Sequence, residues 1–145
     1  MTRPRKAKAS VLDIARGQYT LSEKEEERRC DLLVQALQGD VVRFSQSRAT
    51  HQTEGIPDRR YRVKGVALWW EVKAEDGRLS RAQFAFLRAE KQAQSLAGCG
   101  TSDDLVRVLR CTAEGMPLEI NMVVARWLLR GFRGEPQTAP PPIHF

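Results

Sequence analysis

Residues 66–74, "VALWWEVKA", constrain the fold of this chain more than any other segment. Both alternating faces of the first half are apolar, which is typical of a central strand covered by helices on both sides. The segment then ends in Glu71-Val72-Lys73, and because strand residues two apart share a face, Glu71 and Lys73 point the same way. Burying either charge unpaired is costly, so this strand end is expected to open to water or to bind a cation.

The remaining sequence predicts further strands and helices around this one. Ser22 with Glu25 and Ser80 with Gln83 each match an N-terminal capping box, and Gly39 is suited to the left-handed position that ends a helix. The predicted order is helix, strand, strand, strand, helix, strand, helix, helix, which indicates an α/β fold with a mixed sheet and helices on its faces. The predicted helices cover 20–40, 79–94, 101–111 and 117–132, and the other strands cover 40–44, 56–63 and 95–100.

Charge and composition narrow the class of protein. The formal net charge of the 145-residue chain is +6, with 24 Lys and Arg against 18 Asp and Glu, which favours nucleic acid as a partner. The 3 cysteines form no CxxC pair, so neither a disulfide framework nor a zinc site is predicted. The basic start lacks the apolar segment of a signal peptide, and no apolar run approaches the ~20 residues that cross a bilayer. We expect a cytoplasmic protein with no membrane span.

Asp58 is expected to lie near the charged end of the central strand. The strand that follows Asp58 is joined to the central strand by a short turn at Gly65, so the two strands should be antiparallel. Asp58 would then lie opposite Glu71 or Lys73, close enough for two carboxylates to share one ion. Two carboxylates with waters and phosphate oxygens suit Mg²⁺, which prefers octahedral oxygen ligands.

The pattern Pro57-Asp58 followed by Glu71-Val72-Lys73 resembles the PD-(D/E)xK nuclease motif. Together, "SRATHQTEGIPDRR", "WWEVKAEDGRLSRAQFAFL" and "GCGTSDDLVRVL" look like the VRR-NUC family within that superfamily, over about residues 20–110. The resemblance implies a restriction-endonuclease-like α/β/α sandwich with a central mixed sheet. Two differences are visible: 95–100 is a less clear fourth strand than the family has, and 112–145 lie outside the match.

The resemblance also implies a metal-dependent phosphodiesterase. Asp58, Glu71 and the main-chain carbonyl of Val72 would hold Mg²⁺ or Mn²⁺. Lys73 would orient the attacking water or ease its deprotonation. A cation close to a water lowers its pKa, and positive charge offsets the charge that develops on the phosphate, so these residue types fit that chemistry.

Two further residues follow from the resemblance. The family has an acidic residue on its first helix, and the apolar face of the predicted first helix favours Glu26 while leaving Glu23 and Glu27 open. The family also has a glutamine after the catalytic lysine, which Gln83 matches; Gln83 has an equally good interpretation as the capping partner of Ser80, and both can hold.

The resemblance leads to an expected function, an endodeoxyribonuclease that cuts branched DNA such as a Holliday junction or a flap during repair or recombination. A homodimer would present two active sites to a four-way junction, and small chains of this kind are common in phages and prophages. Arg48 and Arg60 are candidate DNA contacts because basic side chains near the site would meet phosphates. The alternatives are a catalytically silent DNA-binding module and a restriction-type or RNA-directed nuclease.

The predicted organisation has four parts: a flexible basic arm (1–18), the nuclease core (19–111), a C-terminal helical extension (112–133) and a Pro-rich tail (134–145).

Overall fold

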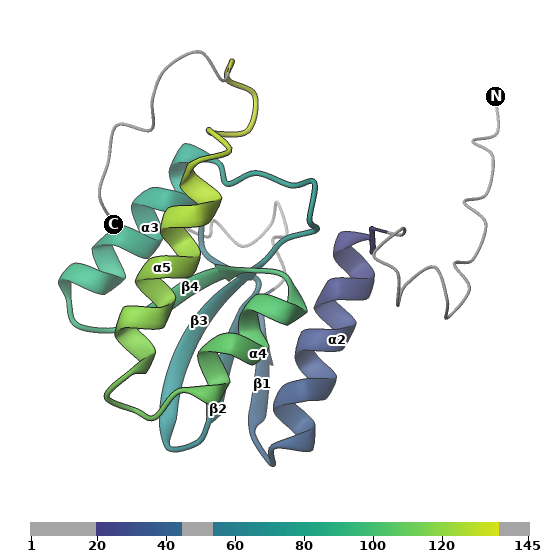
Figure 1. Ribbon diagram of the computed structural model, residues 1–145, viewed down its shortest axis with the longest axis vertical. Coiled ribbons are helices and arrows are strands. Elements are labelled where there is room, and N and C mark those ends of the chain that lie inside the picture. The colour runs from purple at the N-terminus through teal and green to yellow at the C-terminus, as the bar shows by residue number, and fades with distance from the viewer. Residues whose placement is uncertain (1–19, 45–53, 137–145) are drawn as a thin grey trace, which may run out of the picture.

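The structure, a computed structural model, describes residues 20–44 and 54–136 (Figure 1). Three predictions therefore lie outside the described residues: the basic arm over 1–18, most of the Pro-rich tail, and Arg48 as a DNA contact.

The centre of the fold is a mixed four-stranded sheet with its strands side by side in chain order. β1 pairs with β2 and β2 with β3 in antiparallel fashion, whereas β4 runs parallel to β3. The β2–β3 turn has Lys64 and Gly65 at φ 56° and 77°, the left-handed pair typical of a two-residue hairpin. The predicted hairpin at Gly65 and the weakly marked fourth strand are both confirmed. The strands are β1 (Asp40–Arg43), β2 (Arg59–Val63), β3 (Val66–Val72) and β4 (Leu96–Gly100).

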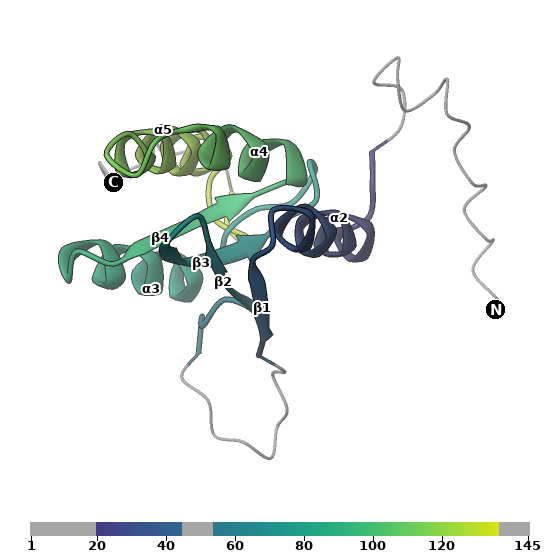
Figure 2. The same ribbon diagram turned by 90° about the horizontal axis from the view of Figure 1, so that it is seen from below.

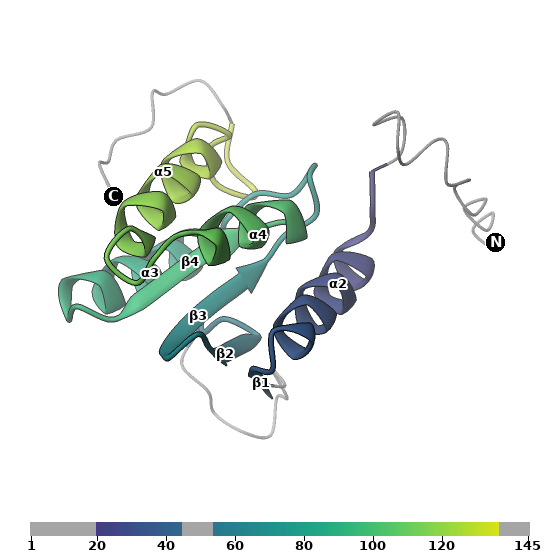
Figure 3. The same cartoon turned by 60° about the horizontal axis from the view of Figure 1, so that its bottom comes forward.

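Helices cover both faces of this sheet. Figure 2 shows α4 and α5 on one side and α3 on the other. α2 contacts β1, β2 and β3, and α4 lies between α2 and α5 (Figure 3). The order of elements confirms the predicted α/β class, and among the described helices none has both the length and the apolar composition to cross a bilayer. The helices are α2 (Glu23–Ala36), α3 (Arg81–Gln92), α4 (Ser102–Arg110) and α5 (Met116–Leu128).

The two predicted capping boxes differ in outcome. At α3 the box is complete: the Gln83 N–H donates to Ser80 Oγ at 3.1 Å, and the Ser80 N–H donates to Gln83 Oε1 at 2.9 Å. At α2 the Glu25 N–H donates to Ser22 Oγ at 3.2 Å, but the Glu25 carboxylate accepts from the Ser22 hydroxyl in place of its N–H. The Ser22 cap is therefore confirmed. The second bond of the predicted box, from the Ser22 N–H to the Glu25 carboxylate, is wrong.

The predicted role of Gly39 is also wrong. Gln38, at φ 62°, is the left-handed residue after α2, and the Gly39 N–H donates to the Val34 carbonyl at 2.9 Å. A Cβ on Gly39 would lie 2.6 Å from the carbonyl oxygen of Arg62. Glycine is needed here for close approach to β2 and not for its backbone conformation.

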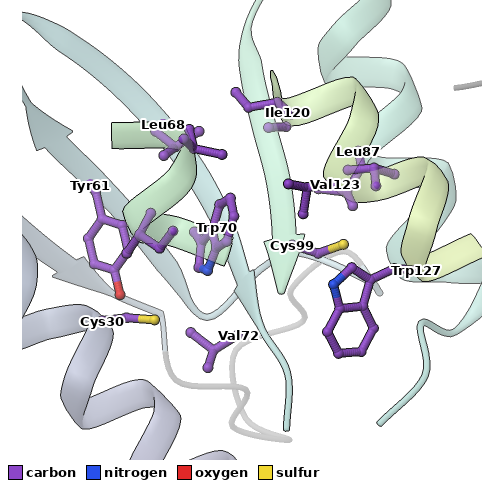
Figure 4. Close-up of a cluster of buried hydrophobic side chains, with 14 of the residues drawn as sticks. Cys30, Tyr61, Leu68, Trp70, Val72, Leu87, Cys99, Ile120, Val123 and Trp127 are labelled. Atoms are coloured by element: carbon purple, nitrogen blue, oxygen red, sulfur yellow. The ribbon is translucent and has the colours of Figure 1, made fainter. Parts of the chain in front are cut away.

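The C-terminal extension shares the hydrophobic core of the sheet (Figure 4). On α5, Val123 and Trp127 are 2 % exposed and pack in the same cluster as Trp70 of β3, which is fully buried. Burying a large apolar side chain contributes about 1.5–3 kcal/mol, so α5 adds substantially to stability. Although residues 112–133 fall outside the family resemblance, α5 is an integral layer of the fold. The labelled core residues are Cys30, Tyr61, Leu68, Trp70, Val72, Leu87, Cys99, Ile120, Val123 and Trp127.

Candidate active site

Asp58 and Glu71 lie beside each other at one end of the β2–β3 hairpin. The register pairs Arg59 with Trp70, so the next residues outward are Asp58 and Glu71. The main chain of Asp58 lowers the pKa of Glu71 through a hydrogen bond, although burial outweighs this effect. Of the two partners predicted for Asp58, the register favours Glu71. Lys73 follows directly after β3, and its N–H donates to the Gly100 carbonyl at 2.9 Å, which keeps it aligned with β4.

A glycine positions the loop that leads to Asp58. Gly55 is buried at φ 86°, a conformation that side chains rarely adopt, and a Cβ there would lie 2.3 Å from the Ala82 carbonyl oxygen. The loop before β2 thus packs directly on the first turn of α3. Because that turn also carries Gln83, Gly55 sets the distance between the Asp58 loop and Gln83.

Glu71 has two partners from different elements. Gln83 Nε2 donates to Glu71 Oε1 at 2.8 Å, and Lys73 Nζ lies 3.8 Å from the same oxygen. Glu71 and Lys73 are 4 % and 3 % exposed, so both charges are buried. Gln83 therefore caps α3, as predicted, and also contacts the Glu71 carboxylate. Its role as the glutamine of the family motif stays a prediction.

Burial is the main influence on the pKa values of the two carboxyl groups. Burial raises the pKa of Glu71 to about 8; Lys73 lowers it, while the carboxylates of Asp58 and Glu23 raise it further. Burial also raises the pKa of Asp58, against the lowering effect of Arg59 and Lys73. A cation bound between the two carboxylates would favour the ionised form of each.

The acidic residues of α2 have different surroundings. Glu26 is buried, as the apolar face predicts, but its Oε2 accepts from the Ser102 N–H at 2.6 Å and so helps to cap α4. Glu27 lies 3.7 Å from Arg59 Nη2. Glu23 is exposed and acts electrostatically on Glu71. Of the three alternatives, Glu26 is turned to α4 and Glu23 faces the site.

The oxygen atoms at this site fit a hard cation. In the part of the chain that the structure describes, no three His, Cys, Asp or Glu side chains are grouped closely enough to hold a metal ion. The oxygen donors at hand are Asp58, Glu71 and the main-chain carbonyl of Val72, which follows Glu71 at the end of β3. Two carboxylates and a carbonyl suit Mg²⁺ or Mn²⁺, ions that keep several water ligands, better than they suit zinc.

Sequence reasoning missed the cluster that holds β2 on α2. Buried Asp31 accepts from Arg59 Nε at 2.9 Å, from the Tyr61 hydroxyl at 2.9 Å and from Arg43 Nη2 at 3.2 Å. These bonds fix the strand that begins directly after Asp58. The sequence does contain a signal for this cluster: Asp31 lies next to the apolar positions of its helix, and the two strands that follow in the chain both carry arginines.

Arg60 lies on the same face of the sheet as Glu71. Its guanidinium lies 4.6 Å from the centroid of the Trp69 ring, which also contacts Phe44 and Phe86, each at 5.3 Å between centroids. Trp69 precedes Glu71 by two residues, so this aromatic group borders the carboxylates. Stacking on Trp69 fixes the direction of the Arg60 side chain.

An apolar cavity of about 300 Å³ lies between the start of β4 and the start of α5, lined by Leu96, Ala97, Pro117 and Ile120. β4 is parallel to β3, with Leu96 opposite Leu68, so this cavity is at the other end of the sheet from Glu71. It contains no carboxylate and is not part of the candidate site.

No protein-family model matches the chain, and no curated protein or solved structure is significantly similar to it. Membership of the VRR-NUC family therefore stays a prediction from the motif.

Proposed function

We propose that the protein is a divalent-metal-dependent endodeoxyribonuclease with a restriction-endonuclease-like fold. The observation that carries this proposal is the group at the end of the β2–β3 hairpin: the carboxylates of Asp58, directly before β2, and of Glu71 in β3, with Lys73 Nζ 3.8 Å from Glu71. A buried lysine beside two carboxylates of raised pKa is expensive to maintain for stability alone. Perturbed groups gathered in this way are typical of functional sites.

Each residue has a role that follows from its contacts. Asp58 and Glu71, with the Val72 carbonyl, would hold Mg²⁺ or Mn²⁺, which when bound supplies charge neutralisation at the phosphate and acidifies a water. Gln83 fixes one oxygen of Glu71 through its 2.8 Å bond. Lys73 places a positive charge where the attacking water and the phosphate would meet, and orients that water through its N–H groups. Exclusion of solvent around Lys73 strengthens each of these interactions.

We propose DNA as the substrate, in branched form such as a Holliday junction or a flap, in repair or recombination. The net charge of +6 supports a polyanionic partner, and Arg60, held over Trp69 beside the site, supports a contact with a backbone phosphate. This activity would assign the protein to the cytoplasm of a bacterial or phage-infected cell.

A homodimer is part of this proposal, and one helix face supports it. Leu118 and Met122 of α5 and its C-cap residue Leu129 are 66 %, 59 % and 69 % exposed and fall on one stripe, opposite the core-facing side of the helix. Two such helices packed antiparallel would bury the stripe. Glu119 of each subunit would then face Arg126 of the partner subunit, because both residues flank the stripe on the same side.

A catalytically silent DNA-binding module is the second candidate. It is favoured by the absence of a three-ligand cluster among the described residues and by the engagement of the Glu26 carboxylate with Ser102. In such a protein Lys73 would serve only as the ion-pair partner of Glu71, and the addition of metal ions would not lead to cleavage of the DNA.

The experiment compares labelled Holliday junction, 5′ flap and plain duplex, each incubated with Mg²⁺, Mn²⁺ or EDTA. We expect cleavage of a branched substrate with metal, none in EDTA, and a loss of at least about 100-fold in Asp58→Ala and Lys73→Ala. Asp103→Ala and Lys24→Ala, exposed residues of the same charge, serve as matched controls and should cut normally. Cleavage that persists in EDTA contradicts the proposal, and salt-sensitive binding without cleavage favours the silent module. Cutting of plain duplex at a fixed sequence would indicate the restriction-type alternative.

A further inference from the structure

A groove of about 370 Å³ opens beside Lys73, between the start of α2 and the loop that follows β3. Glu23 lines it from the α2 side, and Lys73, Asp76 and Arg78 line it from the loop. Arg133 lines it as well, although this residue lies beyond α5 and outside the family resemblance. The groove thus joins the candidate active site to the C-terminal part of the chain.

The segment 129–136, here called the C-terminal strap, is bound closely to the loop after β3. The Arg133 N–H donates to the Leu79 carbonyl at 2.8 Å, and Arg78 Nη1 donates to the carbonyls of Phe132 at 3.4 Å and Glu135 at 3.1 Å. Further pairs join the strap to the loop region: Arg81 with Glu135 at 2.5 Å, and Arg130 with Glu75 at 2.8 Å. These bonds hold the main chain of Arg133 at the rim of the groove.

The cations of the groove have hydrogen-bond capacity that the protein does not use. Bonds to the strap occupy only Nη1 of Arg78, and within residues 20–44 and 54–136 its other two nitrogens have no hydrogen-bond partner. The exposed side chain of Arg133 likewise has no partner in that part of the chain. A guanidinium offers a planar fork of N–H donors that matches the oxygens of a phosphate.

We propose that this groove binds a backbone phosphate of DNA that neighbours the phosphate being cut, with Arg133 and Arg78 as its donors. The proposal rests on the proposed nuclease function, since it assigns a second phosphate of the same substrate to a place next to Lys73. It also gives the C-terminal strap a function: α5 carries the strap to the groove, and the strap provides Arg133. The groove also contains the carboxylates of Glu23 and Asp76, so the phosphate would have to bind nearer to the arginines than to these two side chains.

The test measures binding of a labelled Holliday junction by fluorescence anisotropy in EDTA, so that cleavage plays no part. Arg133→Ala should raise Kd by about tenfold and reduce the slope of log K against log salt concentration by about 1. Arg133→Lys, which keeps the charge without the fork, should recover part of the affinity. The matched control is Arg107→Ala, an exposed arginine in the C-terminal half of α4, which should stay within about twofold of the wild type.

An Arg133→Ala protein that binds like the Arg107→Ala control, with an unchanged salt slope, overturns the proposal. Circular dichroism confirms folding of each variant, and the Arg133 main-chain bond to Leu79 is retained in alanine. The two proposals fail separately. If no metal supports cleavage but Arg133→Ala still weakens binding, the groove is a DNA phosphate site on a non-cutting protein; if cleavage occurs and Arg133→Ala binds normally, only the groove proposal fails.

Discussion

Asp104→Ala should destabilise the protein by about 3–5 kcal/mol, because this carboxylate joins the start of α4 to α5. Asp104 is 5 % exposed, and its Oδ2 accepts from the Thr101 N–H at 3.0 Å and from Trp127 Nε1 at 3.0 Å. Its Oδ1 accepts from Arg126. Alanine would leave two buried N–H groups without an acceptor, at about 1–3 kcal/mol each, and would remove the carboxylate that pairs with Arg126.

Urea unfolding followed by circular dichroism measures this loss. The control is Asp103→Ala, which removes the same charge from the same first turn of α4 but from an exposed position, and should cost at most about 1 kcal/mol. Trp127→Phe removes the indole donor while keeping an aromatic ring. If the bond is real, Asp104→Ala should cost less in the Trp127→Phe background than in the wild type.

Two results would refute this reasoning. One is an Asp104→Ala protein within about 1 kcal/mol of Asp103→Ala, which would mean that water replaces the lost carboxylate. The other is strict additivity of Asp104→Ala and Trp127→Phe, which would mean that their hydrogen bond contributes nothing.

Three other predictions address the site and the surfaces. In EDTA, stability should fall as pH rises from about 4.5 to about 8, because the folded state holds the Glu71 proton more tightly than the unfolded chain. At about 1.4 kcal/mol per pKa unit, the loss of stability is on the order of 3–5 kcal/mol. Thermal melts of Glu71→Gln should show no such loss over this pH range. Equal slopes of stability against pH in the wild type and the variant would contradict the prediction. Gly55→Ala should cost at least about 2 kcal/mol more in urea unfolding than Gly134→Ala, since both have positive φ but only Gly55 meets a neighbouring carbonyl. Met122→Glu should convert a dimer to a monomer in analytical ultracentrifugation at micromolar concentration. Leu32→Glu should not, because Leu32 lies on α2, where its side chain is 52 % exposed against 59 % for Met122; a wild-type monomer would remove the dimer from the proposal.

Features set by short-range chemistry could be predicted from the sequence. The Ser80–Gln83 capping box needs residues only three apart, and the hairpin turn at Gly65 fixes the register that brings Asp58 beside Glu71. The order of elements follows from the same local signals, because hydrophobic periodicity and turn residues act within a few positions.

Features that depend on distant residues could not be predicted. Glu26 faces the buried side of its helix, as the periodicity indicates, but its partner is the N–H of Ser102, 76 residues away. Gly39 looks like a helix stop, but glycine is needed there because the Arg62 carbonyl lies close to it. Arg62 is in β2, so the contact forms only once β2 has packed beside the end of α2. The position of Arg133 in the same groove as Lys73 also requires the completed packing of α5, and no local pattern encodes it.

The 3 tryptophans of the chain have three different surroundings, which makes them built-in optical probes. The buried indole nitrogen of Trp70 has no hydrogen-bond partner among the described residues, whereas that of Trp127 donates to a carboxylate. Trp69 lies half-buried under Arg60, next to the carboxylates of the site. Emission from Trp70 should therefore report on collapse of the core and emission from Trp127 on docking of α5, while Trp69 should change its intensity when a ligand moves Arg60. A single unlabelled sample could then follow folding and ligand binding by fluorescence.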